Sequence, residues 1–412
     1  MRIVQLNMTH EGSTGKIMLQ IAQVARAKGH EARTYSTEAF SIRGKPAPFS
    51  VPDHFFWGSF YENMLHYILG STLGRNGCYG RQGTRRLIKE LERFQPDVLH
   101  LHNLHSHCIH LPLLFRYIKK NHIRTVWTLH DCWTFTGQCP YFDMISCEKW
   151  KTGCHHCQGE MNYPKSRVDN TRRMFRLKKK WFTGVEDMIL VTPSQWLADL
   201  TRESFLKDYP VTVIHNGIDL SVFTPTDSDF RRKYGCEDKI ILLGIAFGWS
   251  KRKGLDVIIE LAKRLDDKFR IVLVGGNEDV DKQLPANVIS IHRTSDQQEL
   301  AKVYSVADLF INPTREDNYP TVNMEALACG TPVLTFRTGG SPEIPDDTCG
   351  AIVEKDDVNE MEKQIRRICE EKPFTEAACL RRAKEFDMNT KFLEYVQLYE
   401  NCSHSINGTL HG

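Results

Sequence analysis

The chain has 412 residues, of which 41% are hydrophobic and 25% charged, and its formal net charge is +3. This composition excludes a largely disordered chain, and so small a net charge gives no reason to expect a nucleic-acid partner. One hydrophobic core rarely grows to this size, so we expect two domains. The opening MRIVQLNMT lacks the features of a secretion signal, and no apolar run approaches the roughly 20 residues that span a bilayer.

The first half of the chain alternates apolar strands with helical patterns, which is typical of a parallel sheet covered by helices. Predicted strands lie at Arg2–Leu6, Val98–Leu101, 125–129, Met188–Thr192 and 211–214, and the first predicted helix at 17–27. The basic run 172–180 is predicted to be a solvated helix face. Because Phe175, Trp181 and Phe182 interleave its charges, a membrane-surface contact is the alternative.

The pattern starts again after Asn216 and Gly217 and predicts a second doubly wound domain. Its strands are predicted at Ile240–Ile245, Phe269–Val274, Leu309–Asn312 and Val333–Phe336, and its helices at 255–265, 297–306, 360–370 and 375–385. A terminal helix at 390–399 is expected to pack elsewhere, and the polar tail 401–412 to be frayed. In open α/β sheets ligands bind beyond the carboxyl ends of the strands, so the loops there are expected to carry function.

Residues 312–344 are the most informative segment and read NPTREDNYPTVNMEALACGTPVLTFRTGGSPEI. Asp317 and Glu325 are separated by seven residues, and a carboxylate accepts several hydroxyl hydrogen bonds, as binding of a sugar or ribose requires. The alternative is that these acids only complement a helix dipole. Gly339 and Gly340 suit a backbone that approaches a ligand closely.

This segment resembles the donor site of the family-4 retaining glycosyltransferases, whose two acids at this spacing precede an Ala-Cys-Gly-Thr-Pro-Val run and a Gly-Gly pair. The resemblance covers nearly the whole chain. It implies the GT-B fold, with two Rossmann-like domains facing a cleft, and no metal requirement for catalysis. It also implies that Glu325 holds the ribose of the donor and that Asp317 contacts the transferred sugar. Glu316 lies beside Asp317 and is the alternative sugar contact, although the spacing favours Asp317.

The segment GWSKRKGLD follows a strand and precedes a helix, which places Lys253 where a cation can neutralise a departing diphosphate. On composition alone, a solvated turn with three basic residues is as good an interpretation of this segment as a diphosphate-binding site. The family pairs such a lysine with an upstream arginine that this sequence lacks, so Lys251 or Arg252 is expected to substitute.

The first domain offers its own candidates at strand ends. Gly15, in the turn HEGSTGKI, is expected near phosphate or acceptor, with a weaker role for Lys16, and the turn does not have P-loop spacing. His130 closes the predicted strand 125–129, where the family pattern places a histidine near the donor sugar. The histidine-rich run 100–107 is expected to line the cleft and not to bind metal.

Four cysteines form a cluster that could hold a structural zinc ion, because zinc prefers soft tetrahedral ligands. The candidate ligands are Cys139, Cys147, Cys154 and Cys157, with His155 and His156 as substitutes. Four unligated thiols are the equally weighted alternative, because the spacing is looser than in standard fingers.

The sequence thus predicts a retaining hexosyltransferase that uses a UDP- or GDP-sugar and a glycan or lipid-linked acceptor, in bacterial surface polysaccharide synthesis. The domains are predicted at 1–218, with a cysteine-rich insert at 132–160, at 219–385, and at 386–412 as a helix returning to the first domain plus a tail. A nucleotide-sugar epimerase and a non-catalytic nucleotide-sugar-binding protein are the alternatives. The protein is expected in the cytoplasm, with a possible peripheral contact at the inner membrane face.

Overall fold

The computed structural model describes residues 1–37, 52–105, 108–159 and 163–407, and the side chains up to residue 401. The chain divides into two compact units, of which the first comprises Met1–Ile214 and Phe392–Gly412 and the second His215–Lys391. Within the described residues, no helix is both long and apolar enough to cross a membrane.

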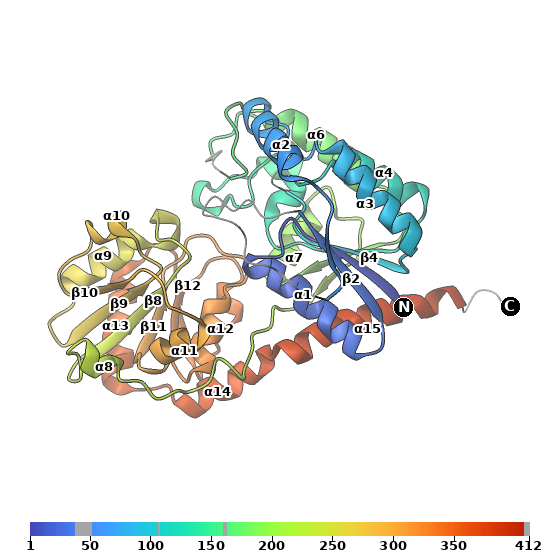
Figure 1. The fold of residues 1–412 in the computed structure, drawn as a ribbon. Helices are drawn as coiled ribbons and strands as arrows, with labels where there is room; N and C mark the ends of the chain where they lie inside the picture. Colours follow the sequence, from blue (N-terminus) through green and yellow to red (C-terminus); the bar gives the residue numbers. More distant parts are fainter. Residues whose placement is uncertain (38–51, 106–107, 160–162, 408–412) are drawn as a thin grey trace. The chain divides into compact units, whose positions relative to one another are not determined.

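The first unit is built on a seven-stranded parallel sheet with the strand order β3-β2-β1-β4-β5-β6-β7 (Figure 1). Its strands are β1 (Arg2–Leu6), β2 (Glu31–Ser36), β3 (His54–Phe56), β4 (Val98–Leu101), β5 (Thr125–Thr128), β6 (Met188–Thr192) and β7 (Val211–Val213). In the central pairs Ile3 lies opposite Ala32 on one side and opposite Val98 on the other. The order reverses between β1 and β4, which is where ligands bind in sheets of this kind.

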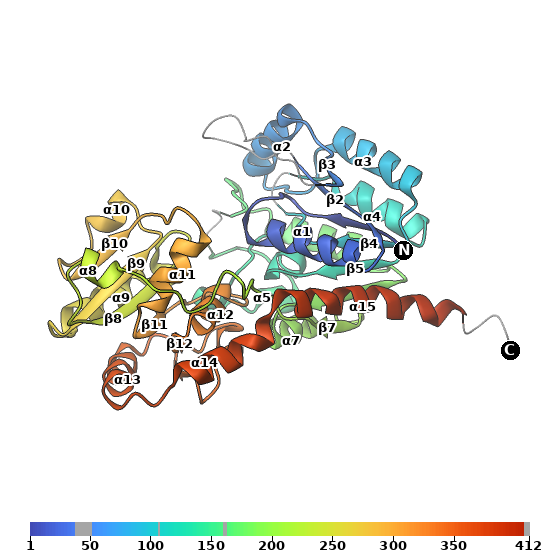
Figure 2. The same ribbon diagram turned by 60° about the horizontal axis from the view of Figure 1, so that its bottom comes forward.

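Helices cover both faces of this sheet, with α3, α4 and α6 side by side on one face and α1 and α15 on the other (Figures 1 and 2). The helices are α1 (Gly12–Ala27), α2 (Phe60–Leu73), α3 (Arg81–Phe94), α4 (Leu111–Lys120), α5 (Lys149–Thr152), α6 (Thr171–Phe182), α7 (Gln195–Glu203) and α15 (Met388–Asn407). Tyr399 of α15 meets His100 of β4, with 2.6 Å between the phenol oxygen and Nδ1. This buried contact explains why the end of the chain belongs to the first unit.

The second unit has a six-stranded parallel sheet with the order β10-β9-β8-β11-β12-β13. Its strands are β8 (Ile240–Ile245), β9 (Phe269–Val274), β10 (Val288–Ile291), β11 (Leu309–Asn312), β12 (Val333–Phe336) and β13 (Gly350–Val353). The order reverses between β8 and β11, so the loops after these strands lie at the topological switch point.

The helices of the second unit follow its strands alternately, as in other doubly wound folds. They are α8 (Phe230–Lys233), α9 (Leu255–Arg264), α10 (Glu278–Asp281), α11 (Gln297–Ser305), α12 (Thr321–Ala328), α13 (Val358–Glu371) and α14 (Glu376–Ala383). The prediction of two doubly wound α/β domains is confirmed.

One local prediction is wrong and another holds with one exception. The helix predicted at 390–399 is longer, since α15 continues to Asn407, and only residues 408–412 of the predicted frayed tail lie outside the described residues. The cations of the basic run 172–180 are exposed, as predicted for a solvated helix face, except for Lys178, which is fully buried in α6 and donates a hydrogen bond to the carbonyl of Trp133. Burial lowers the pKa of Lys178 to about 7.

Candidate active site

Three loops of the second unit meet at the carboxyl edge of its sheet, after β8, β11 and β12. Gly339, in the loop after β12, has a φ of +54°, and a Cβ added there would lie 1.7 Å from the carbonyl oxygen of Asp317. The amide of Gly340 donates to the carbonyl of Asn318 over 3.0 Å. Gly254, after β8, is likewise pressed against the carbonyl of Pro313. Glycine at both positions therefore permits backbone to contact backbone, which fixes the loops relative to one another.

An ion pair links two of these loops. The Lys253 ammonium, at the end of a 3-10 turn formed by Lys251–Lys253, donates to Oδ2 of Asp317 over 2.5 Å. Each side chain is about four-fifths buried, with exposures of 20% and 19%. The structure thus brings together the predicted diphosphate cation and the predicted sugar-binding carboxylate.

Further hydrogen bonds join the loops that carry the other basic and acidic candidates. Arg252 donates to the carbonyl oxygen of Glu316 over 3.2 Å, and the amide of Arg315 donates back to the Arg252 carbonyl over 2.9 Å. Glu316 is buried, whereas Lys251 is exposed and its carbonyl accepts a hydrogen bond from the Arg315 guanidinium. Arg252 is therefore better placed than Lys251 to act beside Lys253.

Arg315 anchors the loop after β11 through contacts that the sequence did not reveal. Its guanidinium forms a bidentate pair with Asp256, over 2.7 and 2.9 Å, and a third contact with Asp356 over 2.6 Å. Burial alone would lower the pKa of Arg315. The hydrogen bonds and charges of Asp256 and Asp356 outweigh this effect, so the pKa is raised. Because Asp256 opens α9, this pair holds the loop after β11 against the start of that helix.

Glu325 projects from α12 and accepts a hydrogen bond from the hydroxyl of Tyr304 over 2.9 Å. Tyr304 is fully buried in α11. Burial, and next the nearby Glu325 carboxylate, raise the pKa of Tyr304 well above its usual value, so the phenol stays protonated and donates. One carboxylate oxygen of Glu325 is thus fixed by the protein, which orients the side chain.

A buried polar chain joins β11, α12 and the turn after β12. Asn312 donates to Asn323 over 2.8 Å, Asn323 donates to Ser341 over 2.9 Å, and Ser341 lies 2.6 Å from the Thr335 hydroxyl. All four side chains are buried, so each hydrogen bond replaces water that the groups would otherwise need. The network keeps α12, and with it Glu325, in register with the glycine loop.

The first unit places His130 just beyond the end of β5, at the edge where ligands bind. Its Nε2 lies 3.0 Å from Nδ1 of His102, and Nε2 of His102 lies 2.9 Å from the amide oxygen of Gln5. Burial lowers the pKa of His130 to about 4 despite the neighbouring Asp131 carboxylate. His130 is therefore neutral at physiological pH and can act through hydrogen bonds. Asp131 itself contacts His105, 3.0 Å away.

Acid should destabilise the first unit because of three of these histidines. Burial holds the pKa of His100 and of His102 well below the ordinary value, and that of His130 at about 4. In the unfolded chain these histidines bind protons below about pH 6.5, but in the native state they stay neutral. The free energy of unfolding therefore decreases as the pH falls from about 6.5 towards 4. Each histidine contributes at most about 1.4 kcal/mol per pH unit.

We therefore expect the free energy of unfolding to fall by up to about 4 kcal/mol per pH unit between pH 5.5 and 4.5. Urea titrations followed by tryptophan fluorescence measure it, since six of the seven tryptophans lie in the first unit. The variant His102→Asn should lose about a third of this slope. A slope that is the same in the variant would contradict the assignment.

Gly15 has a structural reason to be glycine. It lies buried in the first turns of α1, where an added Cβ would come within 2.4 Å of the carbonyl carbon and oxygen of His10. The turn after β1 therefore folds tightly against the helix start. A contact of Gly15 with phosphate or acceptor stays a prediction, as does the weaker role of Lys16. In the histidine-rich run, His107 lies outside the described residues.

The four candidate zinc ligands line one small cavity, together with Phe142 and Trp150. In the part of the chain that the structure describes, no group of three or more His, Cys, Asp or Glu side chains is placed to hold a metal ion. A tetrahedral site would require the four sulfur atoms to draw together. The zinc site stays a prediction, supported by the convergence of Cys139, Cys147, Cys154 and Cys157.

If zinc binds, protein purified without added metal should contain about one zinc per chain. Cys147→Ser should reduce the zinc content and lower the melting temperature, since structural zinc contributes folding energy. Cys236→Ser, a free buried cysteine of the second unit, is the control. Elemental analysis that finds well under one zinc in the unmodified protein removes the prediction.

Comparison with known proteins identifies the family. Residues 15–222 match the family described as Glycosyltransferase Family 4, and residues 237–371 match Glycosyl transferases group 1. The putative colanic acid biosynthesis glycosyl transferase WcaC of Escherichia coli K12 is 28% identical over 317 residues, which cover 74% of this chain and 76% of that protein.

Solved structures support the same fold. The sucrose-phosphate synthase of Thermosynechococcus elongatus superposes with a TM-score of 0.72 at 17% identity, covering 98% of this chain and 100% of that one. HepE of Anabaena, in complex with UDP, gives 0.69 at 15% identity, covering 97% and 100%. The chain therefore belongs to glycosyltransferase family 4 and is a transferase with two Rossmann-like domains of the GT-B type.

Proposed function

We propose that this transferase moves a hexose from a UDP- or GDP-sugar to a glycan or lipid-linked acceptor, with retention of configuration. The observation that carries the proposal is the partly buried Lys253–Asp317 pair, held between the loops after β8 and β11 with Gly339 against the Asp317 backbone. A cation and a carboxylate fixed at one point suit a donor that carries both a diphosphate and sugar hydroxyls. HepE, which shares the fold, has been crystallised with UDP and with UDP-glucose.

Each side chain of the donor site has a proposed role. Lys253 stabilises the charge that develops on the departing diphosphate, with Arg252 as the second cation and Lys251 as its alternative. Glu325, which the Tyr304 hydroxyl orients, binds the ribose hydroxyls. The backbone of Gly339 and Gly340 approaches the donor from the loop after β12.

The reaction follows as a same-face displacement at the anomeric carbon. The bond between that carbon and the diphosphate oxygen breaks, the acceptor hydroxyl oxygen bonds to the carbon, and the acceptor proton passes to the leaving diphosphate. Before the donor binds, Asp317 neutralises Lys253. Once the donor diphosphate forms an ion pair with Lys253, Asp317 becomes available to accept hydrogen bonds from the sugar.

His130 is proposed to orient the transferred sugar as a neutral hydrogen-bonding group. Its position after β5 and the fixed contact with His102 support this role. An imidazolium would bring a charge that the buried site disfavours, as the pKa of about 4 indicates.

The proposal is tested with a panel of UDP- and GDP-hexoses, each incubated with and without a lipid-linked saccharide acceptor. We expect one donor to give a glycosylated product only with acceptor, and NMR of the new linkage to show the donor's anomeric configuration. Isomerised or hydrolysed donor without acceptor would instead indicate an epimerase. Donor binding, seen as a rise in melting temperature, without any turnover would indicate a regulator. The relationship to WcaC supports bacterial surface polysaccharide as the product class.

The two adjacent acids give a sharper expectation. Asp317→Asn should lower kcat by about 100-fold, because it removes the partner of Lys253 and the predicted sugar acceptor. Glu316→Gln should change kcat less than fivefold, since this variant keeps the backbone carbonyl that accepts hydrogen bonds from Arg252 and Thr314. Steady-state kinetics of both variants show which acid contacts the transferred sugar. A loss of kcat confined to the Glu316 variant would assign that contact to Glu316.

A further inference from the structure

A chain of three polar side chains runs from the interior of the first unit to its surface. Oδ1 of Asp131 accepts a hydrogen bond from the amide of Trp133 over 2.9 Å, and Oδ2 lies 3.0 Å from Nε2 of His105. Nδ1 of His105 in turn lies 3.3 Å from the phenol oxygen of Tyr163. Asp131 and His105 are buried, whereas Tyr163 is 48% exposed. The chain therefore links a buried carboxylate to the phenol of a half-exposed tyrosine.

Tyr163 lies where the first sheet is expected to bind ligands. His105 follows β4 and Asp131 follows β5, and the phenol oxygen also lies 3.9 Å from the sulfur of Met8, which follows β1. The amide of Met8 donates to the carbonyl of Asn103 over 2.8 Å and so joins the loops after β1 and β4. The strand order reverses between these two strands, and Tyr163 contacts the loop after each of them.

The surroundings of Tyr163 hold its ring in one place. The ring meets that of His105 edge-on, with 5.3 Å between the centroids and an angle of 89° between the planes. The carbonyl of the next residue, Pro164, accepts a hydrogen bond from the buried side-chain amide of Gln138 over 2.7 Å. An aromatic side chain that is fixed in this way loses little conformational freedom when a ligand binds to it.

The contacts of His105 determine what the phenol can offer to a ligand. Burial alone would raise the pKa of Asp131, but its contacts with His105 and the Trp133 amide lower it overall, so the group is a carboxylate. A carboxylate only accepts hydrogen bonds, so Nε2 of His105 carries a hydrogen. A neutral ring then accepts the phenol hydrogen at Nδ1, and a charged ring donates to the phenol oxygen. In both cases the oxygen keeps a lone pair that can accept a hydrogen bond from a hydroxyl group.

We propose that Tyr163 binds a sugar residue of the acceptor, with the phenol oxygen accepting a hydrogen bond from a sugar hydroxyl and the ring covering the apolar face of the sugar. His105 and Asp131 are positioning residues that hold the phenol. A rigid tyrosine supplies both contact area and a polar group at a small cost in conformational entropy. Asp131 directly follows His130, the residue proposed to orient the transferred sugar. This role rests on the proposed transfer to an acceptor, and it narrows the group bound at this edge to a saccharide.

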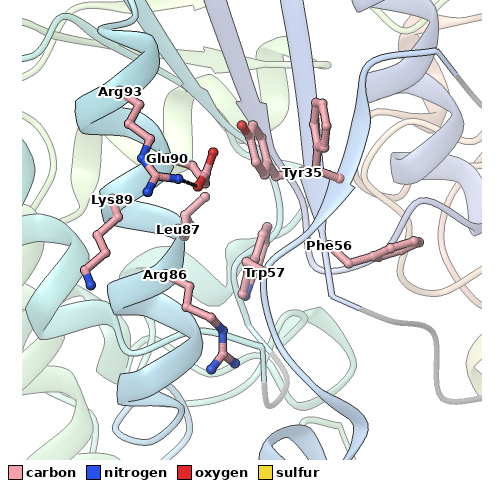
Figure 3. Close-up of a pocket in the computed structure, with 9 residues that line it drawn as sticks. Tyr35, Phe56, Trp57, Arg86, Leu87, Lys89, Glu90 and Arg93 are labelled. Carbon is pink, nitrogen blue, oxygen red and sulfur yellow. Dashed lines mark hydrogen bonds and ion pairs between the residues drawn. The ribbon is translucent and has the colours of Figure 1, made fainter.

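A hollow elsewhere on the first unit suits an acceptor sugar less well. Figure 3 shows this hollow between β3 and α3, and its volume is about 410 Å³. Because β3 is the edge strand, β2 and β1 separate the hollow from the switch point. The exposed rings in its lining, Phe55 and Phe56, carry no hydroxyl group. Arg93, one of its cations, is paired with Glu90 over 2.7 Å. The hollow is therefore the alternative that a control variant must test.

Saturation-transfer NMR with simple glycosides tests the site on the full chain without any donor. The probes are the methyl α- and β-glycosides of glucose, galactose and mannose. We expect at least one of them to bind, and Tyr163→Phe to weaken its binding about fivefold, because one neutral hydrogen bond is lost. Tyr163→Ser also removes the ring and should weaken binding at least about 20-fold. Phe56→Ser is the matched control, because it removes a ring of similar exposure, 43%, from the hollow, and it should bind the glycoside as the unmodified protein does.

A double-mutant cycle tests whether His105 acts through Tyr163. If the imidazole only positions the phenol, His105→Asn should weaken glycoside binding about threefold in the unmodified protein and hardly at all in the Tyr163→Phe background. Circular dichroism establishes the temperature at which every variant is folded, and binding is compared there. Equal losses in both backgrounds would contradict the positioning role.

Transfer assays separate this site from the proposed function. With the donor and the lipid-linked saccharide that give product, Tyr163→Phe should raise the KM for the acceptor about fivefold and leave the KM for the donor unchanged. Glycoside binding through Tyr163 without transfer from any donor would count against the proposed function alone. The proposed site is overturned if the unmodified protein binds none of the glycosides, if Tyr163→Ser binds them unchanged, or if Phe56→Ser is the variant that loses binding.

Discussion

Replacing Lys253 with methionine is expected to lower kcat/KM by about 1,000-fold, the largest effect of any single side chain in the donor site. The ammonium of Lys253 is mostly buried and lies 2.5 Å from Asp317, so its charge acts in a setting where water screens it little. Charge develops on the diphosphate as the sugar departs, and a cation fixed in advance stabilises the transition state more than the ground state. Steady-state kinetics with the donor found in the panel measure the effect.

Two further variants separate catalysis from simple loss of an ion pair. Lys268→Met removes another lysine of the same unit, which pairs with Glu370 over 3.1 Å, and kcat/KM should not change. Lys253→Met/Asp317→Asn removes both partners, which avoids leaving a buried carboxylate unpaired. This double variant should recover melting temperature but not turnover. Recovered turnover would show that the single variant failed only because Asp317 lacked a partner.

Strands that are apolar throughout were predictable from the sequence. Ile240–Ile245 and Leu309–Asn312 begin and end where the structure places β8 and β11, because strands buried on both faces read as continuous apolar runs. The strand β2 was missed because Thr34 and Ser36 interrupt its pattern. Both hydroxyls lie close to ring nitrogens of His54 on β3, at 2.9 and 3.1 Å, so the polar side chains are satisfied across the strands. Such pairing depends on tertiary structure, which periodicity cannot reveal.

In the candidate donor site, too, local sequence features were predictable and tertiary contacts were not. The spacing of Asp317 and Glu325 and the Gly-Gly pair are local features, so the resemblance to the family could propose them as site residues. Arg315 and Tyr304 were missed because their partners lie far away in sequence, at Asp256 and Glu325.

Gly339→Ala tests whether the contact between two loops holds the donor site together. The methyl group would have to occupy space 1.7 Å from the Asp317 carbonyl oxygen, so the loop after β11 must move. A displacement of about 1 Å at a reacting group can cost about 100-fold in rate. We expect kcat/KM to fall at least that far, together with loss of the thermal shift that donor binding gives.

Gly235→Ala is the matched control for this substitution. Gly235 has nearly the same backbone conformation, with φ of +59° against +54°, but an added Cβ there has nothing within 4 Å. Both variants should therefore lose about 1 kcal/mol of stability, because alanine is strained in the left-handed region. Only Gly339→Ala adds the collision with Asp317. If the two variants lose stability equally and both keep donor binding, the contact between Gly339 and Asp317 does not position the sugar-binding carboxylate. If only Gly339→Ala loses turnover, backbone packing beneath Asp317 sets the geometry on which the Lys253 pair depends.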